Sequence, residues 1–253
     1  MSVLNVKTLL SGTVALLGSM LACTQVLAAD AAATRVLIEQ YLQGDNRTET
    51  ERARDASRKP ADALEFFGLQ DTMKVLEISP ATGYWTKFLG PTLCNNGGEL
   101  VVSVGVNDAF KNDVMTLPGL ECVSAINDGV TLGNMPPFEF ETGNFDMVLT
   151  FWNLHNPNAE MRANMNQAIF DALKPGGIYG AEDHTRRHNQ PTDRAVGRRL
   201  DPVLVIKEMI DIGFDFVDFS DMHYHTEDDL TQEVGTPGVQ GNTDRFVLKF
   251  RKP

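Results

Sequence analysis

The stretch that decides the fold is "MKVLEISPATGYW", residues 73–85. Its first half has an apolar centre and predicts a buried β-strand. Pro80 and Gly83 then indicate a tight turn, and we expect a helix to begin at Gly83. In this order of strand, turn and helix, backbone N–H groups at the start of the helix can face a ligand. We therefore interpret the stretch as a candidate ligand-binding loop.

The alternation of strands and helices continues to the C-terminus. Right-handed crossovers between successive strands favour a mostly parallel sheet with helices on both faces. Only about twenty polar, glycine-bearing residues separate the last two strands, so we expect the last strand to be antiparallel. The sequence thus predicts an α/β, Rossmann-like doubly wound sheet of seven strands. The expected strands are residues 73–79, 99–106, 120–127, 145–152, 178–183, 214–220 and 244–250, and the expected helices 83–93, 157–173 and 201–213.

Residues 29–70 are predicted to form an N-terminal helical cap and linker ahead of the main domain, residues 71–253. Val36, Leu37 and Tyr41 recur at helical spacing near its start. The polar stretch "GDNRTETERARDASRKP", residues 44–60, indicates a solvated helix or linker. A short amphipathic helix is expected to follow it and to end at Gly68.

Residues 1–28 have the composition of a secretory signal peptide. They carry a lone Lys7 and an apolar run of about a dozen residues, and small residues precede Asp30. The run is shorter than the roughly 20 residues that a membrane span needs. We expect cleavage after Ala28 or Ala29 and a periplasmic or secreted protein without stable membrane insertion. A membrane anchor and lipidation at Cys23 are the alternatives.

The mature chain is acidic. Removal of Lys7, the one charged residue of the leader, changes the formal net charge from −12 to −13. An acidic surface repels phosphate backbones, so we expect a small-molecule substrate and no nucleic-acid partner. Cys94 and Cys122 would remain in an oxidising compartment, either as a disulfide bond or as two buried thiols. Neither has a spacing typical of a zinc–thiolate site.

The order of these parts resembles the class I S-adenosylmethionine-dependent methyltransferases. The likeness rests on the glycine turn after the first strand, on "LKPGG" (173–177) before the fifth, and on the terminal antiparallel strand. "VLTFWNLHN" (148–156) and "TDRFVLKFRKP" (243–253) look like a group of exported bacterial predicted methyltransferases. The resemblance covers about residues 60–253. It implies S-adenosyl-L-methionine as the cofactor and methyl transfer to a small or medium-sized acceptor.

The resemblance assigns the loop after the first strand to the cofactor. Glu77 would orient the loop and the amine region of the methionine arm, and Ser79, Ala81 and Gly83 would wrap the cofactor. Ser79 and Ala81 stand where such loops usually carry glycine. Each is tolerable if its φ stays negative, and Pro80 stiffens the turn at negative φ. Gly83 is the position least expected to tolerate change. The alternative is a plain strand–helix turn.

Further cofactor contacts are implied after the other strands. The acid that the family places at the end of the second strand, to hold the ribose hydroxyls, is missing here. Asn107 or Asp108 would substitute for it, and Asp128 would meet the adenine amine. The residues implied beside the methionine arm are Phe151, Trp152 and Asn153.

Five histidines lie at or beyond the carboxyl ends of strands four to six, on the ligand side of the predicted sheet. Methyl transfer to oxygen or nitrogen needs a positioned acceptor whose proton is removed, and histidine is the usual base near neutral pH. His155 and His184 are the candidate catalytic residues. A helix-capping or supporting role is the alternative for His155. The other three are His188, His223 and His225.

Two other functions remain open. The spacings "HTRRH" (184–188) and "HYH" (223–225), with Asp183 nearby, would suit a metal-dependent enzyme, although they form no strict motif and we assign no metal ligands. The missing acid and the reduced glycines would suit a non-catalytic periplasmic ligand-binding protein on a degenerate methyltransferase fold. Five arginines within residues 186–199 would either attract an anionic substrate or belong to a solvated lid.

Overall fold

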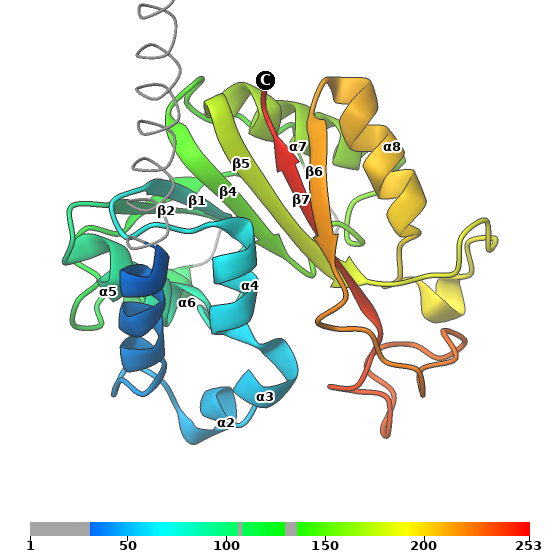
Figure 1. The fold of residues 1–253 in the computed structure, drawn as a ribbon, viewed down its shortest axis with the longest axis horizontal. Coiled ribbons are helices and arrows are strands. Elements are labelled where there is room, and N and C mark those ends of the chain that lie inside the picture. Colours follow the sequence, from blue (N-terminus) through cyan, green and yellow to red (C-terminus); the bar gives the residue numbers. More distant parts are fainter. Residues whose placement is uncertain (1–30, 106–107, 130–135) are drawn as a thin grey trace, which may run out of the picture.

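A seven-stranded sheet forms the centre of the molecule (Figure 1). The computed structural model describes residues 31–105, 108–129 and 136–253. The strand order is β3-β2-β1-β4-β5-β7-β6. The strands are β1 (Lys74–Ile78), β2 (Glu99–Val104), β3 (Ser124–Asn127), β4 (Phe145–Phe151), β5 (Leu173–His184), β6 (Asp215–Ser220) and β7 (Arg245–Arg251).

The sheet is parallel except for its last strand. β1 pairs in parallel with β2 and β4, and β4 pairs in parallel with β5. β7 lies between β5 and β6 and is antiparallel to both. The chain moves outward from β1 to β3 and then returns to the other side of β1, so its winding reverses between β1 and β4. The predicted Rossmann-like sheet with an antiparallel last strand is confirmed.

Helices cover both faces of the sheet. Residues 31–42 are helical, and a 3₁₀ turn lies at Arg194–Val196. Asn158 caps α7, because its side chain accepts a hydrogen bond from the Met161 N–H at 3.0 Å. The further helices are α2 (Glu49–Arg52), α3 (Asp55–Arg58), α4 (Pro60–Phe67), α5 (Thr86–Cys94), α6 (Asp108–Asp113), α7 (Ala159–Ala172) and α8 (Pro202–Ile212).

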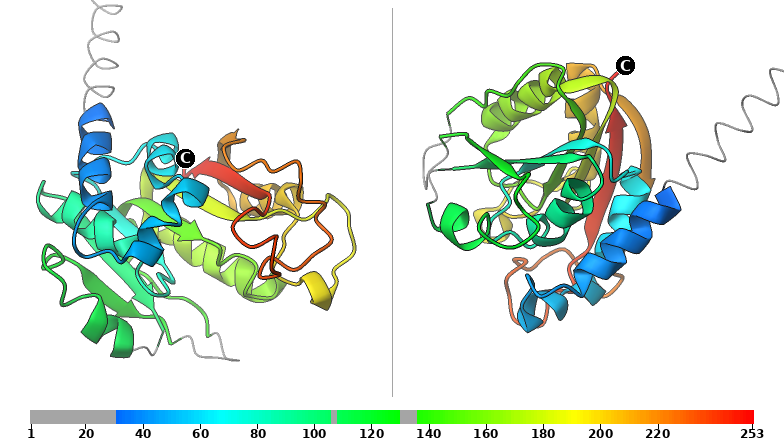
Figure 2. Two further views of the ribbon diagram at one scale, coloured as in Figure 1. Left: turned by 90° about the horizontal axis from the view of Figure 1, so that it is seen from below. Right: turned by 90° about the vertical axis from the view of Figure 1, so that its left-hand side faces the viewer.

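Alternate side chains of the strands enter two separate hydrophobic cores. In β1, Val75 packs into a core shared with the cap, α5 and α6. Its neighbours Leu76 and Ile78 pack into a second core shared with α7 and α8. Figure 2 shows these two sets of helices on opposite sides of the sheet. The continuous apolar strands follow from burial on both faces.

The polar segment of the cap is packed against the domain, so its interpretation as a solvated helix or linker is wrong. Arg47 is 2 % exposed and donates to both carboxylate oxygens of Asp55. The Tyr84 hydroxyl donates to the same carboxylate. Glu51, which is also buried, pairs with Lys87 of α5 at 2.7 Å. Charge pairing across this interface fixes the cap on α5.

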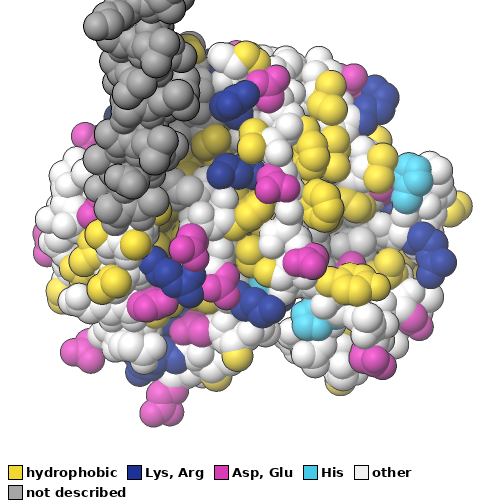
Figure 3. All heavy atoms as spheres, in the orientation of Figure 1, with side chains coloured by type: hydrophobic (Ala, Val, Ile, Leu, Met, Phe, Trp, Pro, Cys, Tyr) yellow, Lys and Arg dark blue, Asp and Glu magenta, His cyan; other side chains and the backbone are white. Residues whose placement is uncertain are grey.

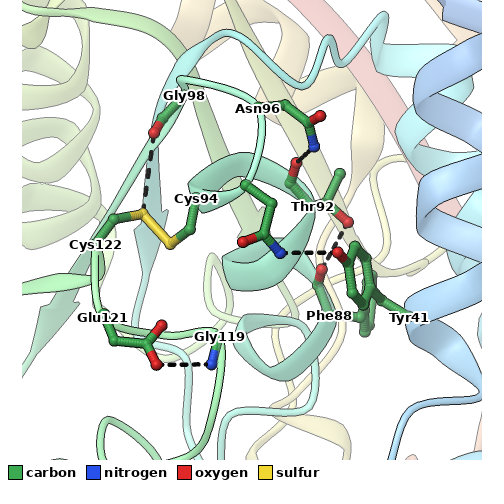
Figure 4. The surroundings of a disulfide bond; sticks show 10 residues. Tyr41, Phe88, Thr92, Cys94, Asn96, Gly98, Gly119, Glu121 and Cys122 are labelled. Atoms are coloured by element: carbon green, nitrogen blue, oxygen red, sulfur yellow. Dashed lines mark hydrogen bonds between the residues drawn. A yellow bond between two sulfur atoms is a disulfide. The ribbon is translucent and has the colours of Figure 1, made fainter.

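Cys94 and Cys122 form a disulfide bond (Figure 4). Cys94 ends α5 and Cys122 lies just before β3, with a sequence separation of 28 residues. Of the two alternatives that the sequence left open, the structure has the disulfide. It ties α5 to the edge of the sheet that carries β3.

The opposite edge of the sheet is exposed. Every residue of β6 except Ser220 is exposed, and Phe219 is 64 % exposed. Figure 3 shows hydrophobic side chains gathered over the part of the sheet that β5, β7 and β6 form. None of the helices in the described part of the chain has both the length and the apolar character needed to cross a lipid bilayer.

Candidate active site

A cavity of about 170 Å³ opens where the winding of the sheet reverses. Residues 77–82 and 84–85 line it from the end of β1, residues 151–153 line it from the end of β4, and Arg54 and Arg58 line it from the cap. Open α/β sheets bind ligands at this place, outside the carboxyl ends of the strands. The volume is below the roughly 300–1,000 Å³ of pockets for drug-sized ligands. A drug-sized ligand would therefore have only part of its volume inside this cavity.

The loop after β1 has a left-handed backbone at both positions where glycine was expected. Ser79 has φ of 50° and Ala81 has φ of 54°, so the negative φ under which these side chains would be tolerated without strain is not met. Trp152, at the end of β4, has φ of 62°. A side chain in this region costs about 1–2 kcal/mol. Such strain persists where the surroundings enforce it, and it is concentrated at functional sites.

Gly83 belongs to the turn after β1 but does not line the cavity. Its φ is 77°, and its N–H donates to the Pro80 carbonyl at 2.9 Å. A Cβ at this position would lie 2.8 Å from Cγ1 of Val114. The positive φ and this close approach both require glycine, which supports the expectation that Gly83 tolerates no change.

Asn153 braces the loop. Its Nδ2 donates to the Ile78 carbonyl at 3.0 Å and to the Phe151 carbonyl at 3.1 Å. A third contact reaches the Ser79 carbonyl at 3.4 Å. The side chain therefore joins the ends of β1 and β4 on the two sides of the cavity that it lines. The amide protons of Asn153 are used to hold the backbone at the ends of these two strands.

Glu77 places a buried carboxyl group on the cavity wall. Its side chain is 1 % exposed, and the Thr86 hydroxyl donates to Oε2 at 2.7 Å. Burial raises the pKa of Glu77 to about 7, against the smaller lowering effect of Thr86. A cationic ligand group beside it would offset the cost of ionising this carboxyl.

Trp152 lines the cavity, and its indole ring is fixed by a hydrogen bond to Glu182. Its indole Nε1 donates to Oε1 of Glu182 at 2.9 Å, and Arg245 donates to the same oxygen at 2.9 Å. The guanidinium carbon of Arg58 lies 3.9 Å from the Trp152 ring centroid and 4.2 Å from that of Tyr84. Burial lowers the pKa of Arg58 to about 10, so the group stays charged at neutral pH.

Sequence reasoning missed the two arginines of the cap. The available signal was the four-residue spacing in "RDASR", residues 54–58. Because the same pattern fits a solvated helix, only the packing of the cap against α5 shows that Arg54 and Arg58 reach the cavity.

His155 and His184 lie beyond Trp152 and do not line the cavity. Nδ1 of His155 is 2.6 Å from Oδ1 of Asp183, and its backbone N–H donates to Oδ2 at 3.0 Å. The ring centroids of His155 and His184 are 6.0 Å apart, and those of Trp152 and His184 are 5.0 Å apart. Burial lowers the pKa of His184 to about 2, and its Nδ1 lies 2.9 Å from Oγ1 of Thr243. His184 is therefore neutral.

The remaining predicted contacts lie apart from the cavity or outside the described residues. Asp128 follows β3 and accepts a hydrogen bond from the Ser103 hydroxyl at 2.6 Å. Asn107 lies outside the described residues. Asp108 begins α6.

The other three histidines are dispersed. Nδ1 of His188 is 2.9 Å from Oδ2 of Asp201, beside the start of α8. His223 is buried, and Arg245 lies 3.2 Å from its Nδ1. His225 lies on the loop between β6 and β7. Across residues 31–105, 108–129 and 136–253, no three His, Cys, Asp or Glu side chains are grouped so that they could hold a metal ion.

The arginine-rich segment holds a loop together. Arg199 is fully buried and binds both oxygens of Asp228, at 2.9 and 3.0 Å. Arg198 pairs with Glu233 at 2.5 Å. Arg199 was expected either to attract an anionic substrate or to belong to a solvated lid. Because it is buried and paired with Asp228, both expectations are wrong for this residue.

Comparisons with known proteins find likeness in structure only. No protein-family profile matches the sequence. No curated protein matches it either. A SAM-dependent methyltransferase from Aquifex aeolicus is similar over 79 % of this chain and 98 % of its own, with 13 % identity and a TM-score of 0.55.

Two further solved structures are similar. The [4+2]-cyclase SpnF has 20 % identity and a TM-score of 0.58, over 84 % of this chain and 86 % of its own. The glycopeptide N-methyltransferase MtfA, complexed with S-adenosyl-L-homocysteine, has 14 % identity and a TM-score of 0.53, over 79 % and 90 %. At these identities the likeness concerns the fold. This chain has the Rossmann-like fold of the SAM-dependent methyltransferases.

Proposed function

We propose that the protein is an S-adenosylmethionine-dependent methyltransferase that acts on a small or medium-sized acceptor. The observation that carries the proposal is the cavity at the reversal point of the sheet, bordered by the strained loop and by Glu77. Similar structures include methyltransferases, one of them complexed with S-adenosyl-L-homocysteine.

The residues of the cavity fit the methionine arm of this cofactor. Glu77 presents a buried carboxyl whose ionisation a neighbouring ammonium or sulfonium would favour. The left-handed backbone at Ser79 and Ala81 shapes the turn that would wrap the arm, and Asn153 keeps that turn in place. When bound, the cofactor supplies an electrophilic methyl group on its sulfonium.

His155 is the proposed base. Because Asp183 engages Nδ1, the imidazole presents Nε2 as the free acceptor for a proton. The acceptor molecule would lie on the histidine side of Trp152, and its proton would pass to Nε2 as the methyl group bonds to its heteroatom. His184, which stays neutral, would add no competing charge.

Titration calorimetry with S-adenosyl-L-homocysteine tests cofactor binding. We expect the mature protein to bind it and Glu77→Gln to weaken binding roughly ten- to 150-fold, since one charged contact is worth about 1.5–3 kcal/mol. Glu139→Gln, at an exposed position, is the matched control. The absence of binding heat for wild-type protein at millimolar ligand would contradict the proposal.

Release of S-adenosyl-L-homocysteine from S-adenosylmethionine, over a panel of phenols, amines and carboxylic acids, tests the transfer. His155→Gln should lower the rate about 10²–10⁴-fold and leave cofactor affinity unchanged. Because the fold also occurs in a [4+2]-cyclase, cofactor binding without transfer on any acceptor would favour another role. The comparisons lend no support to the binding-protein and metal-enzyme alternatives.

We also propose that the protein is exported to the periplasm or secreted, like the bacterial group that its sequence resembles. The leader in residues 1–28 supports this. The Cys94–Cys122 disulfide is a second support, because such bonds persist in oxidising compartments.

A further inference from the structure

Two arginines of the cap enter the cavity without a partner for their charge. Arg58 is 8 % exposed and Arg54 is half-buried. Within the residues that the structure describes, neither guanidinium has an ion-pair or hydrogen-bond partner, and the buried Nε atom of each is unsatisfied. Buried charges in proteins are ordinarily paired, because desolvating an unpaired charge is costly.

Aromatic rings hold these guanidinium groups in place. Arg58 lies between the rings of Tyr84 and Trp152, at 4.2 and 3.9 Å from their centroids. Arg54 lies 5.1 Å from the centroid of Tyr84. Contact with the ring faces stabilises a guanidinium but leaves the N–H groups at its edge available. The two side chains are therefore positioned without being neutralised.

The acidic groups around the cavity are occupied or weakly ionised. Asp55 is engaged by Arg47. Oε1 of Glu182 accepts the indole N–H of Trp152 and pairs with Arg245 at 2.9 Å. Oε2 of Glu182 is buried without a hydrogen-bond partner among the described residues, and the charge of Glu182 acts on Arg58 without a direct ion pair. Glu77, the acid that lines the cavity, has a pKa raised to about 7 by burial. The cavity wall thus carries an excess of positive charge in an otherwise acidic protein.

We propose that Arg54 and Arg58 form an anion site in the cavity wall that binds a carboxylate group. The inference rests on the proposed methyltransferase function and names a ligand class for its cavity. Arg54 directly precedes α3 and Arg58 ends it, so the two residues are about one helical turn apart. The planar fork of a guanidinium matches the two oxygens of a carboxylate.

Two molecules can supply this carboxylate. S-adenosylmethionine carries a sulfonium and an ammonium against one carboxylate. Its methionine arm can therefore lie beside two guanidinium groups only with the carboxylate toward them. The methyl acceptor is the second source, in which case the site selects a carboxylic acid for methylation.

The experiment compares two adenosyl ligands by titration calorimetry on the mature protein. S-adenosyl-L-homocysteine carries the amino-acid arm, and 5′-methylthioadenosine lacks it. The variants are Arg58→Met and Arg54→Met, with Arg187→Met, an exposed arginine outside the cavity, as the matched control. If the cofactor supplies the carboxylate, Arg58→Met lowers affinity for S-adenosyl-L-homocysteine about tenfold or more and leaves that for methylthioadenosine unchanged.

A second arm tests the acceptor as the source. Benzoate and succinate are titrated into protein loaded with S-adenosyl-L-homocysteine. If the acceptor supplies the carboxylate, both adenosyl ligands bind the variants normally, and wild-type protein binds a carboxylate that Arg58→Met and Arg54→Met do not. Equal binding of all four ligands to wild-type protein and both variants overturns the anion site.

Failure of the proposed function gives a different result. In that case neither adenosyl ligand binds wild-type protein, and benzoate and succinate are titrated into the unloaded protein. Binding that depends on Arg58 still supports the anion site, and no binding overturns it.

Thermal melting separates a ligand-binding role from a structural one. An unpaired buried charge adds little to the stability of the unliganded fold, so Arg58→Met should keep or raise the melting temperature. A lower melting temperature with unchanged ligand affinities would identify a structural role and overturn the proposal. If Arg58→Met does not fold, the half-buried Arg54→Met answers the same question.

Discussion

Ser79, Ala81 and Trp152 keep a left-handed backbone without being glycine, and all three border one cavity. The Ser79 N–H still donates to the Ser103 carbonyl at 2.9 Å, which continues the pairing of β1 with β2. Asn153 grips the same loop from the β4 side. These bonds enforce a conformation that costs about 1–2 kcal/mol per residue. Ser79 and Ala81 thus carry small side chains at left-handed positions where glycine is usual.

Replacing Ala81 by glycine tests this strain. Because the φ of Ala81 is 54°, Ala81→Gly should raise the free energy of unfolding by about 0.5–1 kcal/mol, net of the greater entropy of an unfolded glycine. Ala168→Gly, inside α7, is the control and should lower it by about 1 kcal/mol. Urea denaturation measures both. A loss of stability in Ala81→Gly would show that the residue is unstrained.

The Glu77 carboxyl makes stability depend on pH. Its pKa is raised from 4.5 to about 7 in the folded protein, so the folded state holds the proton more tightly. The associated stability is fully present below pH about 4.5 and is lost as the pH rises through about 7. Relative to Glu77→Gln, wild-type protein should lose on the order of 3 kcal/mol between pH 4.5 and 8.

Urea denaturation of both proteins across this range measures that difference. Glu139→Gln, an exposed change, should follow the wild-type profile. Parallel profiles for wild-type protein and Glu77→Gln would mean that folding leaves the pKa of Glu77 unchanged.

At the scale of elements, the cap completes the cavity. α2 and α3 are each four residues long, too short to be stable alone in water. They persist because Asp55 binds Arg47 and Tyr84, and because Arg245 of β7 donates to the Ser57 carbonyl. The cap, near the N-terminus, thus contacts β7, near the C-terminus. This contact places Arg54 and Arg58 at the cavity.

The disulfide is the covalent link between elements. It closes a loop with a sequence separation of 28 residues, which should stabilise the fold by about 3 kcal/mol. In the double variant Cys94→Ala, Cys122→Ala, we expect a melting temperature lower by roughly 6–12 °C. Dithiothreitol should lower wild-type protein to the same value and leave the double variant unchanged. A wild-type melting curve indifferent to reductant would contradict this.

At the scale of the whole molecule, one sheet separates two cores, and the cavity lies at the carboxyl ends of its strands. The cap, α5 and α6 pack on one face, and α7 and α8 on the other. Parallel strands align their carboxyl ends, so residues distant in sequence converge there. Asp183 of β5 thereby meets His155, which follows β4.

Export would remove the leader, so the mass of the recovered protein tests it. Expressed in a bacterium with a functional secretion pathway, the protein should be recovered from the periplasm or medium with Ala29 or Asp30 as its first residue. Intact mass spectrometry measures this. The double variant Ala28→Leu, Ala29→Leu removes the small residues that cleavage requires and should keep its leader. Lipid on Cys23, or an intact Met1 in wild-type protein, would contradict the signal peptide.

The sequence by itself determined the strands and the mostly parallel sheet with an antiparallel last strand. Apolar centres such as Val75-Leu76 mark strands buried on both faces, and local turns such as Gly83 mark their ends. Because these patterns are local and successive crossovers are right-handed, they favour a mostly parallel sheet. The order of the strands in that sheet is seen only in the structure. At Gly83 the local turn pattern already indicated glycine, but the side chain of Val114, which excludes a Cβ there, is distant in sequence, and Gly83 does not line the cavity.

Only the tertiary structure decided which side chains reach the cavity. Arg58 and Arg199 occur in similar polar stretches, yet one enters the cavity unpaired and the other is buried against Asp228. The positive φ of Ser79 is held by hydrogen bonds to β2 and to Asn153, which are distant in sequence. Charge pairing and backbone strain depend on neighbours that the fold brings together, and a linear pattern does not contain those neighbours.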